Sequence, residues 1–237
     1  MGNQQRVVVG INLIRMLWTD GNAHLPCDVR SDDNAHDGVT TTDHVRAMVQ
    51  AAAARGFHPR LLAVASWYAS LEHLNLVRSR PWPWLTHLNA TRLGDPAGSG
   101  KRPIRDVPIP AEGAVVQLTG DGVSTVVALA TPAGGRDDWA TSDLAVRADQ
   151  WAEFARYRWR IEAYHRGSTQ DCGSERAQHR AARAQRNPIG LALWAFRRLA
   201  WHRLRTGTLW CAAKAAIVRE AIRAYLAHPR STQLSTA

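Results

Sequence analysis

The chain has 237 residues, of which 45% are hydrophobic, so it can bury the core of one large domain or two small ones. Its formal net charge is +10, and the basic excess lies in residues 147–237, which carry 17 Lys and Arg against 6 Asp and Glu. This asymmetry predicts a polyanionic partner, nucleic acid first and an anionic membrane second. No apolar run is long enough to cross a bilayer.

The first segment predicts a β-hairpin. Residues 6–18 are rich in Val, Ile and Leu, and residues 23–29 provide a second strand. Asp20 and Gly21 form a tight-turn pair between them, so Asp20 is expected to serve the turn rather than bind a metal. Residues 32–42 are polar and predict a loop. Its acidic residues, Asp32, Asp33 and Asp37, have no pattern that positions them as metal ligands.

Two helices and a short strand follow. Thr42 or Asp43 is expected to cap a helix that Gly56 ends. Residues 60–65 predict a short apolar strand. Residues 67–78 predict a helix whose apolar side chains share one face. Those side chains are Trp67, Leu71, Leu74 and Val77.

Residues 84–90 predict another strand, and the pattern then changes. Between residues 92 and 144 short alternating runs are separated by Gly, Pro and Asp, which is typical of a β-rich segment. From residue 148 onward the pattern is helical. The expected helices cover 148–166, 187–207 with Asn187 as N-cap before Pro188, and 208–227. The three cysteines, Cys27, Cys172 and Cys211, have no metal-site spacing and are expected to be reduced thiols.

Several segments together resemble bacterial insertion-sequence transposases. These are the DDE transposases with a ribonuclease-H-like fold and a β-rich insertion before the last acid. The hairpin GINLIRMLWTDGNAHLPCDVR, the strand and helix AARGFHPRLL and SWYASLEHLNLVR, the flanks LTHLNATR and DWATSDL, and the helices YRWRIEAYHRG and ERAQHRAARAQRNPIGLALWAF all match this pattern. The resemblance covers nearly the whole chain.

The resemblance implies a fold class and a division of the chain. The expected fold is α/β, with a ribonuclease-H-like mixed sheet. Residues 1–91 would be a truncated first part of the catalytic domain, 92–146 the β-rich insertion, and 147–237 a C-terminal helical part with the last catalytic acid. In relatives the first acid lies on a strand before the hairpin, so N-terminal truncation is expected. Without that central strand, the sheet would have two open edges in its interior. Its two halves could close up, or the chain could fold poorly.

The family signature Y-x2-R-x3-E-x6-K is half retained. Arg158 and Glu162 match its arginine and glutamate, whereas Ala155 and Thr169 occupy the tyrosine and lysine positions. The resemblance implies that Glu162 is the last catalytic, metal-binding acid. It also implies that Arg158, with Arg160 and Arg166 beside it, contacts DNA phosphate.

The second acid is also lost. Relatives have D-S-W-Y after the central strand, whereas this chain has Ala65 at the aspartate position. DDE enzymes use two Mg²⁺ ions about 3.5–4 Å apart, and such a pair needs several carboxylates. Glu162 alone supplies one charge. We therefore do not expect this chain to bind Mg²⁺ well, or to cut or join DNA.

Other residues have a structural and a functional interpretation, and both remain open. Glu162 with Arg158 could be only an i,i+4 surface pair. The arginines at 176, 180 and 183 could be a solvated face or a phosphate-tracking strip. Trp194 and Trp201, seven residues apart, are expected to pack in the core rather than stack on bases. His165 could contact phosphate or only pack against the protein. Ser66 is expected to cap the helix after Ala65.

The sequence thus predicts a DNA transposase-like protein, a catalytically impaired fragment whose partner is DNA in the bacterial cytoplasm and nucleoid. Whether it is an enzyme stays open. One alternative is an inactive module that binds DNA, a full-length transposase or a second copy of itself. Another is a gene remnant without function. No membrane partner is expected.

Overall fold

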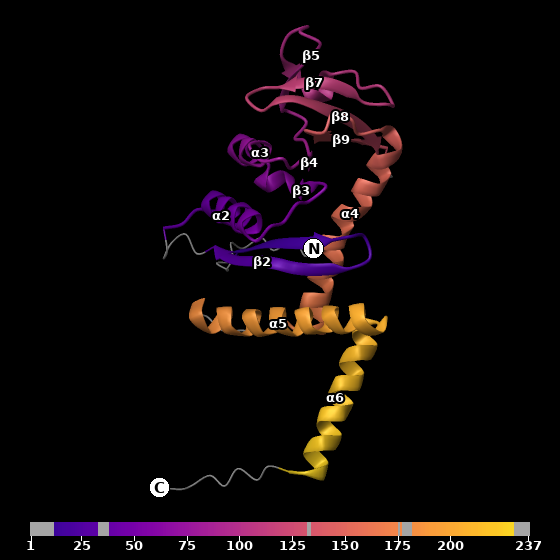
Figure 1. Cartoon of the computed structure of the whole chain (residues 1–237). Helices are drawn as coiled ribbons and strands as arrows, with labels where there is room; N and C mark the ends of the chain where they lie inside the picture. The colour runs from indigo at the N-terminus through magenta and orange to yellow at the C-terminus, as the bar shows by residue number, and fades with distance from the viewer. Residues whose placement is uncertain (1–11, 33–37, 132–133, 175, 177–181, 230–237) are drawn as a thin grey trace. The chain divides into compact units, whose positions relative to one another are not determined.

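The computed structural model describes residues 12–32, 38–131, 134–174, 176 and 182–229. They form a mixed α/β structure of two compact units (Figure 1). The first unit comprises residues 1–16 and 28–158, and the second comprises residues 17–27 and 159–237. Helix α4 (Ala148–Arg166) begins in the first unit and ends in the second. The expected α/β class is confirmed, while the three-part division of the chain stays a prediction.

The expected hairpin is present. Strands β1 (Asn12–Thr19) and β2 (His24–Asp32) form a two-stranded sheet of their own. The carboxylate of Asp20 accepts hydrogen bonds from the backbone N–H groups of Asn22, at 2.9 Å, and Ala23, at 2.7 Å. These bonds lower the pKa of Asp20, Ala23 contributing most. Asp20 is therefore a turn residue, as predicted.

Helix α2 (Thr41–Ala54) begins earlier than predicted. Its N-cap is Thr40, not Thr42 or Asp43. Thr40 and Asp43 form a capping box, in which each side chain accepts a hydrogen bond from the backbone N–H of the other. Asp43 therefore contributes to the cap from the third helical position. Gly56 follows the C-cap with a positive φ of 78°, which favours glycine, and the predicted helix end is confirmed.

The predicted helix at 67–78 is divided in two. Strand β3 (Leu62–Val64) leads into a 3₁₀ turn, η1 (Ser66–Tyr68), and α3 (Leu71–Arg78) starts afresh with Ser70 as its N-cap. Helical spacing alone placed Trp67 with Leu74, but the break changes the direction of the chain. Trp67 is 84% exposed, whereas Leu74 and Val77 are buried.

A seven-stranded mixed sheet contains the predicted β-rich segment. Its strand order is β3-β4-β9-β8-β7-β5-β6, with β3 and β4 parallel and the other neighbours antiparallel. The remaining strands are β4 (Trp84–His87), β5 (Leu93–Pro96), β6 (Arg102–Pro103), β7 (Ala114–Leu118), β8 (Gly122–Ala130) and β9 (Arg136–Thr141), with a 3₁₀ turn, η2 (Ile104–Asp106), after β6. Strand β3 lies at one edge. In the described residues, the hairpin does not pair with it, so the two sheets remain separate.

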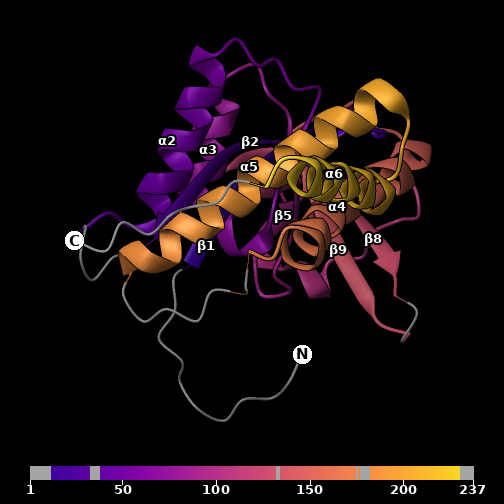
Figure 2. The same ribbon diagram turned by 90° about the horizontal axis from the view of Figure 1, so that it is seen from below.

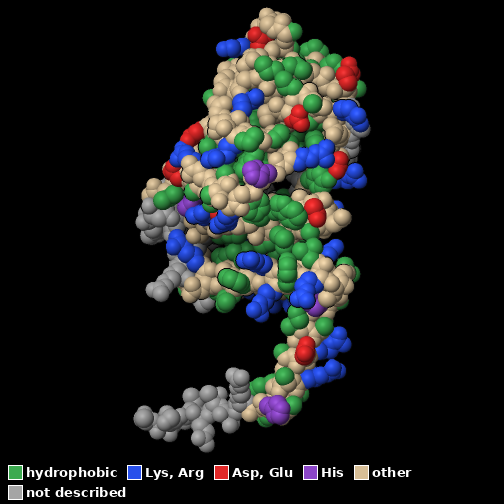
Figure 3. Space-filling view, viewed as in Figure 1, with side chains coloured by type: hydrophobic (Ala, Val, Ile, Leu, Met, Phe, Trp, Pro, Cys, Tyr) green, Lys and Arg blue, Asp and Glu red, His purple; other side chains and the backbone are tan. Residues whose placement is uncertain are grey.

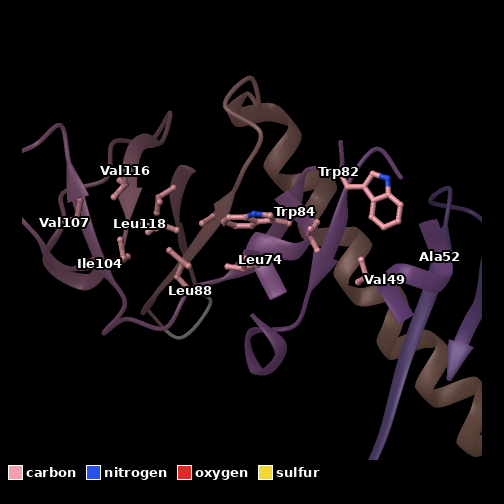
Figure 4. Close-up of a cluster of buried hydrophobic side chains, with 13 residues drawn as sticks. Val49, Ala52, Leu74, Trp82, Trp84, Leu88, Ile104, Val107, Val116 and Leu118 are labelled. Atoms are coloured by element: carbon pink, nitrogen blue, oxygen red, sulfur yellow. The ribbon is translucent and has the colours of Figure 1, made fainter. Parts of the chain in front are cut away.

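Both faces of the long sheet are covered in the first unit. Trp84 and Leu85 are neighbours in β4 and point to opposite faces, as strand geometry requires. Trp84 belongs to a cluster with side chains of α2, α3, β7 and η2 (Figure 4). Leu85 packs with Trp151 and Phe154 from the beginning of α4. Helices α2 and α3 lie side by side (Figures 1 and 2), and His73 of α3 lies 3.1 Å from the carbonyl oxygen of Thr42.

The second unit is built around aromatic rings. Tyr164 of α4 packs edge-to-face on Phe196, with ring centroids 4.8 Å apart, and Phe196 packs likewise on Trp210 at 4.9 Å. Leu17 and Leu25 of the hairpin join this cluster. A π-helical turn, η3 (Gly167–Asp171), follows α4. The chain then forms α5 (Ala182–Thr206) and α6 (Trp210–Ala227).

The predicted start of α5 is wrong. The helix begins by Ala182, so Asn187 is not its N-cap and Pro188 lies inside it. Proline lacks the N–H that would bond the carbonyl four residues earlier, but the helix continues through this position. The predicted end near Gly207 and the third helix are confirmed.

Candidate functional site

Glu162 lies on the last turns of α4 with its side chain exposed, while Tyr164 on the same helix is buried. The ion pair that helical spacing allows with Arg166 is not formed between these two described side chains. Arg166 is exposed. Glu162 is therefore a solvent-facing carboxylate at the end of a helix that is anchored by its other face.

The side chain of Arg160 is less exposed than that of Arg166. Its side chain is half-buried, and its charge acts on His24, which lies at the start of β2. Burial lowers the pKa of His24, and the positive charges of Arg160 and Arg203 lower it further. The His24 ring also lies 2.9 Å from the hydroxyl of Thr19. Arg158 lies in α4 at the signature position, but its side chain is outside the described residues, as is that of Ala155.

Two positions at which the resemblance implies charged groups in relatives, Ala65 and Thr169, have short neutral side chains. Ala65 is exposed at the carboxyl end of β3, immediately before η1. Its methyl group has no atom that could bind a metal. Thr169 lies in the π-helical turn, where its hydroxyl donates to the carbonyl of His165 at 3.0 Å. Thr169 therefore bonds to its own helix end.

The residues next to Ala65 correct one prediction. Ser66 makes no capping hydrogen bond and is not an N-cap, because the cap of α3 is Ser70, whose hydroxyl accepts from the backbone N–H of His73. Burial raises the pKa of Tyr68, whose side chain hydrogen-bonds Asn12. The nearby negative charge of Asp32 raises it further. Tyr68 thus links η1 to β1 of the hairpin within the first unit.

Of the three acidic residues of the predicted loop, the structure describes Asp32, since Asp33 and Asp37 lie outside the described residues. Asp32 ends β2 and accepts a hydrogen bond from the hydroxyl of Thr41 and one from Asn12 at 3.4 Å. Through the bond from Thr41, Asp32 holds the hairpin to α2. No local pattern predicts these contacts, because the partners of Asp32 lie 9 and 20 residues away along the chain.

No metal-binding group is assembled by the described residues. Nowhere among them do three or more His, Cys, Asp or Glu side chains gather in a way that could hold an ion. The three cysteines are free, as predicted, and burial raises the pKa of Cys172. The donors present therefore do not fit a two-metal centre, which needs several carboxylates around the ions.

The exposed face of α5 overturns another prediction. Trp194 is 65% exposed and Trp201 58% exposed, so neither packs in the core. The buried side chains of α5 are Phe196, Leu199 and Ala200, with Ala192, on the opposite face. The guanidinium of Arg197 lies 5.8 Å from the ring centroid of Trp194.

Basic side chains share this exposed face. Arg198 and Arg205 are spaced seven residues apart, like the two tryptophans, so all four lie along one side of the helix. We call this the α5 outer face, made of Trp194, Arg197, Arg198, Trp201 and Arg205. Figure 3 shows basic and hydrophobic side chains next to one another over α5. In the other predicted basic strip Arg176 is exposed, while the side chains of Arg180 and Arg183 lie outside the described residues.

The described helices include none that is long and apolar enough to cross a membrane. A comparison with curated proteins gives no match. A family model described as "Transposase DDE domain" matches residues 12–196, which is most of the chain. The match includes the hairpin, the seven-stranded sheet and the helix with Glu162. The chain therefore belongs to the transposase DDE domain family.

Proposed function

We propose that this chain is a DNA-binding member of its family that does not itself cut or join DNA strands. The observation that carries the proposal is the α5 outer face, which presents two exposed tryptophans and three exposed arginines together. The basic excess of residues 147–237 lies in the same part of the chain. DNA retention needs basic and aromatic side chains and no catalytic acid.

The two residue types on this face have different tasks in the proposal. Arginine binds phosphate through its planar fork of N–H donors, with either single- or double-stranded DNA. Exposed tryptophan stacks on bases that are not paired, and this works with any base because each has a π face. Trp194 and Trp201 lie seven residues apart, or about 10 Å along the helix axis. That spacing leaves room for a strand to follow the helix.

The catalytic part of the proposal rests on the donors that have been replaced. Glu162 retains the charge of the family's last acid, but Ala65 offers no oxygen at the position of the second. Thr169 replaces a lysine and bonds to its own helix end. A single exposed carboxylate with DNA phosphates could bind one hydrated Mg²⁺ weakly, but it cannot offset the repulsion of two.

Among the described residues β3 is an edge strand of the seven-stranded sheet, and the hairpin forms a sheet of its own. The bacterial cytoplasm and nucleoid are the proposed location, because that is where DNA is found.

A filter-retention titration against salt tests the DNA-binding part. We expect retention that falls steeply with salt, and a log–log slope that loses about 0.9 for each phosphate contact removed from duplex DNA. The Arg198→Gln variant should lower the slope. The matched control is Arg105→Gln, which removes the same charge from an exposed position in the first unit. No retention even at low salt would overturn the DNA-binding proposal, and equal loss in both variants would remove the α5 outer face from it.

A nicking assay tests the catalytic part separately. Supercoiled plasmid incubated with purified protein and Mg²⁺ should remain intact. Nicking that disappears in Glu162→Gln would show that the remaining acid still works, and the non-cleaving proposal would be wrong. A cooperative thermal unfolding transition is expected, since each unit has its own buried cluster. Its absence would favour a gene remnant.

A further inference from the structure

Two arginines of the second unit lie on the buried faces of their helices. Arg160 is four residues before Tyr164 in α4, and Arg203 is three residues after Ala200 in α5. Helical spacing places each arginine on the same face as that buried neighbour. Both side chains are half-buried. Arg203 therefore lies on the side of α5 away from the α5 outer face, and is not part of that surface.

The two guanidinium groups act on one imidazole ring. His24, at the start of β2, is buried, and its Nδ1 lies 2.9 Å from the hydroxyl oxygen of Thr19. Its pKa is lowered first by burial and then by the positive charges of Arg160 and Arg203. Since this effect weakens with distance, both charges lie near the ring. The hairpin, α4 and α5 thus each bring one basic side chain to the same place.

No acid balances these charges. Among the described residues no carboxylate forms an ion pair with Arg160 or Arg203. Asp20 acts on His24 more weakly than either arginine, and its carboxylate accepts hydrogen bonds from its own turn. Glu162 is exposed and lies two residues from Arg160, which places it on a nearly opposite side of α4. The two like charges repel each other, and a bound anion would offset that repulsion.

Shielded N–H donors accompany the positive charge. Nε of Arg160 and Nε1 of Trp210 are inaccessible to solvent, and neither donates to an acceptor among the described residues. The guanidinium of Arg203 lies 5.3 Å from the ring centroid of Trp210. Stacking uses the face of the guanidinium and leaves its N–H donors, which lie in its plane, available to an acceptor. Unpaired shielded donors are uncommon in folded proteins, and donors gathered with positive charge fit an anionic acceptor.

We propose that Arg160, Arg203 and His24 form a binding site for a phosphate group, which we call the His24 anion site. Each arginine offers a planar fork of N–H donors, which matches the oxygens of phosphate. Donors that come from three elements suit a tetrahedral anion better than a planar carboxylate. The phosphate group is either a phosphodiester of the DNA backbone or free inorganic phosphate. Binding of inorganic phosphate here does not depend on DNA binding by the α5 outer face.

Anion binding and protonation of His24 should strengthen each other. Without an anion, a proton on His24 is opposed by Arg160 and Arg203 and favoured only weakly by Asp20. A bound anion offsets the two positive charges, so it favours the protonated ring. By linkage, the protonated ring then favours the anion by the same factor.

Isothermal titration calorimetry of the full chain with inorganic phosphate, at constant ionic strength, tests the site. We expect a Kd on the order of 1 mM, which Arg160→Gln and Arg203→Gln should each raise by roughly tenfold. The matched control is Arg223→Gln, which removes the same charge from an exposed position of α6 and should bind as the wild type does. No binding by the wild type at about 10 mM phosphate, or equal affinity in all three variants, would overturn the proposal.

Folding of the variants is checked by circular dichroism melts. Arg203→Gln also removes the contact with the ring of Trp210. Arg160→Gln repeats the test from the other helix and leaves that contact in place. A folded Arg160→Gln variant that binds phosphate as tightly as the wild type would overturn the site by itself.

Sulfate tests the part of His24. The charge of sulfate is constant between about pH 5.5 and pH 7.5, the range in which histidine titrates, whereas that of phosphate changes. Wild-type affinity for sulfate should rise as the pH falls, and His24→Gln should lack most of this rise. A rise of equal size in His24→Gln would overturn the assignment of His24 to the site.

The salt dependence of duplex retention identifies the source of the phosphate group. If the DNA backbone supplies it, Arg203→Gln should lower the log–log slope by about 0.9, the value for one phosphate contact. If free phosphate is the ligand, the variant should lose phosphate binding in the calorimeter and keep the wild-type slope. Either result supports the site. A chain that retains no DNA leaves the calorimetric result standing, so failure of the DNA-binding proposal and failure of the His24 anion site are distinguishable.

Discussion

The guanidinium of Arg197 lies over the exposed indole of Trp194, 5.8 Å from its centroid, on a helix whose opposite face is buried. This pair keeps a flat aromatic surface and a positive charge together in solvent. A stacking surface for bases and a donor for phosphate thus lie within one helical turn. The first prediction follows from this arrangement.

Replacing the exposed tryptophans should weaken binding to single-stranded DNA. Each stacked base contributes about 1–3 kcal/mol, so Trp194→Ala and Trp201→Ala should each raise the Kd by roughly 5- to 150-fold. The control is Trp67→Ala, which removes an even more exposed tryptophan from the first unit. Fluorescence anisotropy with a labelled oligonucleotide measures all three. Unchanged affinity in the first two variants would contradict stacking.

Arg78 and Asp121 are expected to stabilise the first unit. Arg78 Nη2 lies 3.2 Å from Oδ2 of Asp121, whose side chain is fully buried. The Arg78→Met variant leaves that carboxylate without its cation and should cost about 3 kcal/mol of unfolding free energy at neutral pH. Arg105→Met breaks an exposed pair with Asp106 and should cost less than about 1 kcal/mol.

The cost of Arg78→Met should also depend on pH. Burial raises the pKa of Asp121 above 3.8, and Arg78 counteracts this. A carboxyl group with a raised pKa contributes stability below its unfolded pKa and loses it as the pH rises through the folded pKa. Removing Arg78 enlarges that loss, so the cost should shrink as the pH falls from neutral toward the folded pKa of Asp121. Urea unfolding across this pH range checks this, and a cost that does not change with pH would refute it.

His24 should make the second unit less stable in mild acid. Its pKa is lowered from 6.5, first by burial and then by Arg160 and Arg203. The unfolded chain therefore binds a proton before the folded chain does, and the free energy of unfolding falls as the pH drops below 6.5 through the folded pKa. The His24→Gln variant should lack this part of the pH dependence. Thermal melts across this range test it, with the exposed His228→Gln as control.

Gly167 is expected to tolerate no side chain. A Cβ there would lie 2.7 Å from Cε2 of Phe196 and 3.0 Å from Cζ3 of Trp210, both in the packed aromatic cluster. Gly167→Ala should destabilise the protein by about 1–3 kcal/mol. Gly190→Ala meets no atom within 4 Å in α5 and should stabilise it by about 0.5–1 kcal/mol. Chemical denaturation distinguishes the two, and a neutral Gly167→Ala would show that the cluster can move.

Much of the local structure could be predicted from the sequence. The Asp20 turn, the end of α2 at Gly56 and the limits of α6 follow from residues that act on their immediate neighbours. The start of α3 could not be predicted in this way, because Ser66 and Ser70 are both good caps and only the path of the chain after β3 selects between them. Pro188 likewise looked like a helix start because its conformation also fits the first turn.

The identity of the side chains determined which chemistry is possible at the positions that the resemblance singles out. Glu162 offers a carboxylate, whereas Ala65 and Thr169 offer neither a carboxylate nor an ammonium group, and no folding can supply one. Only the tertiary structure decided that Trp194 and Trp201 face solvent. Helical spacing determines which residues share a face, but not which face meets the core. That choice was made by the larger set of contacts around Phe196, Tyr164 and Trp210, which turned the tryptophans outward.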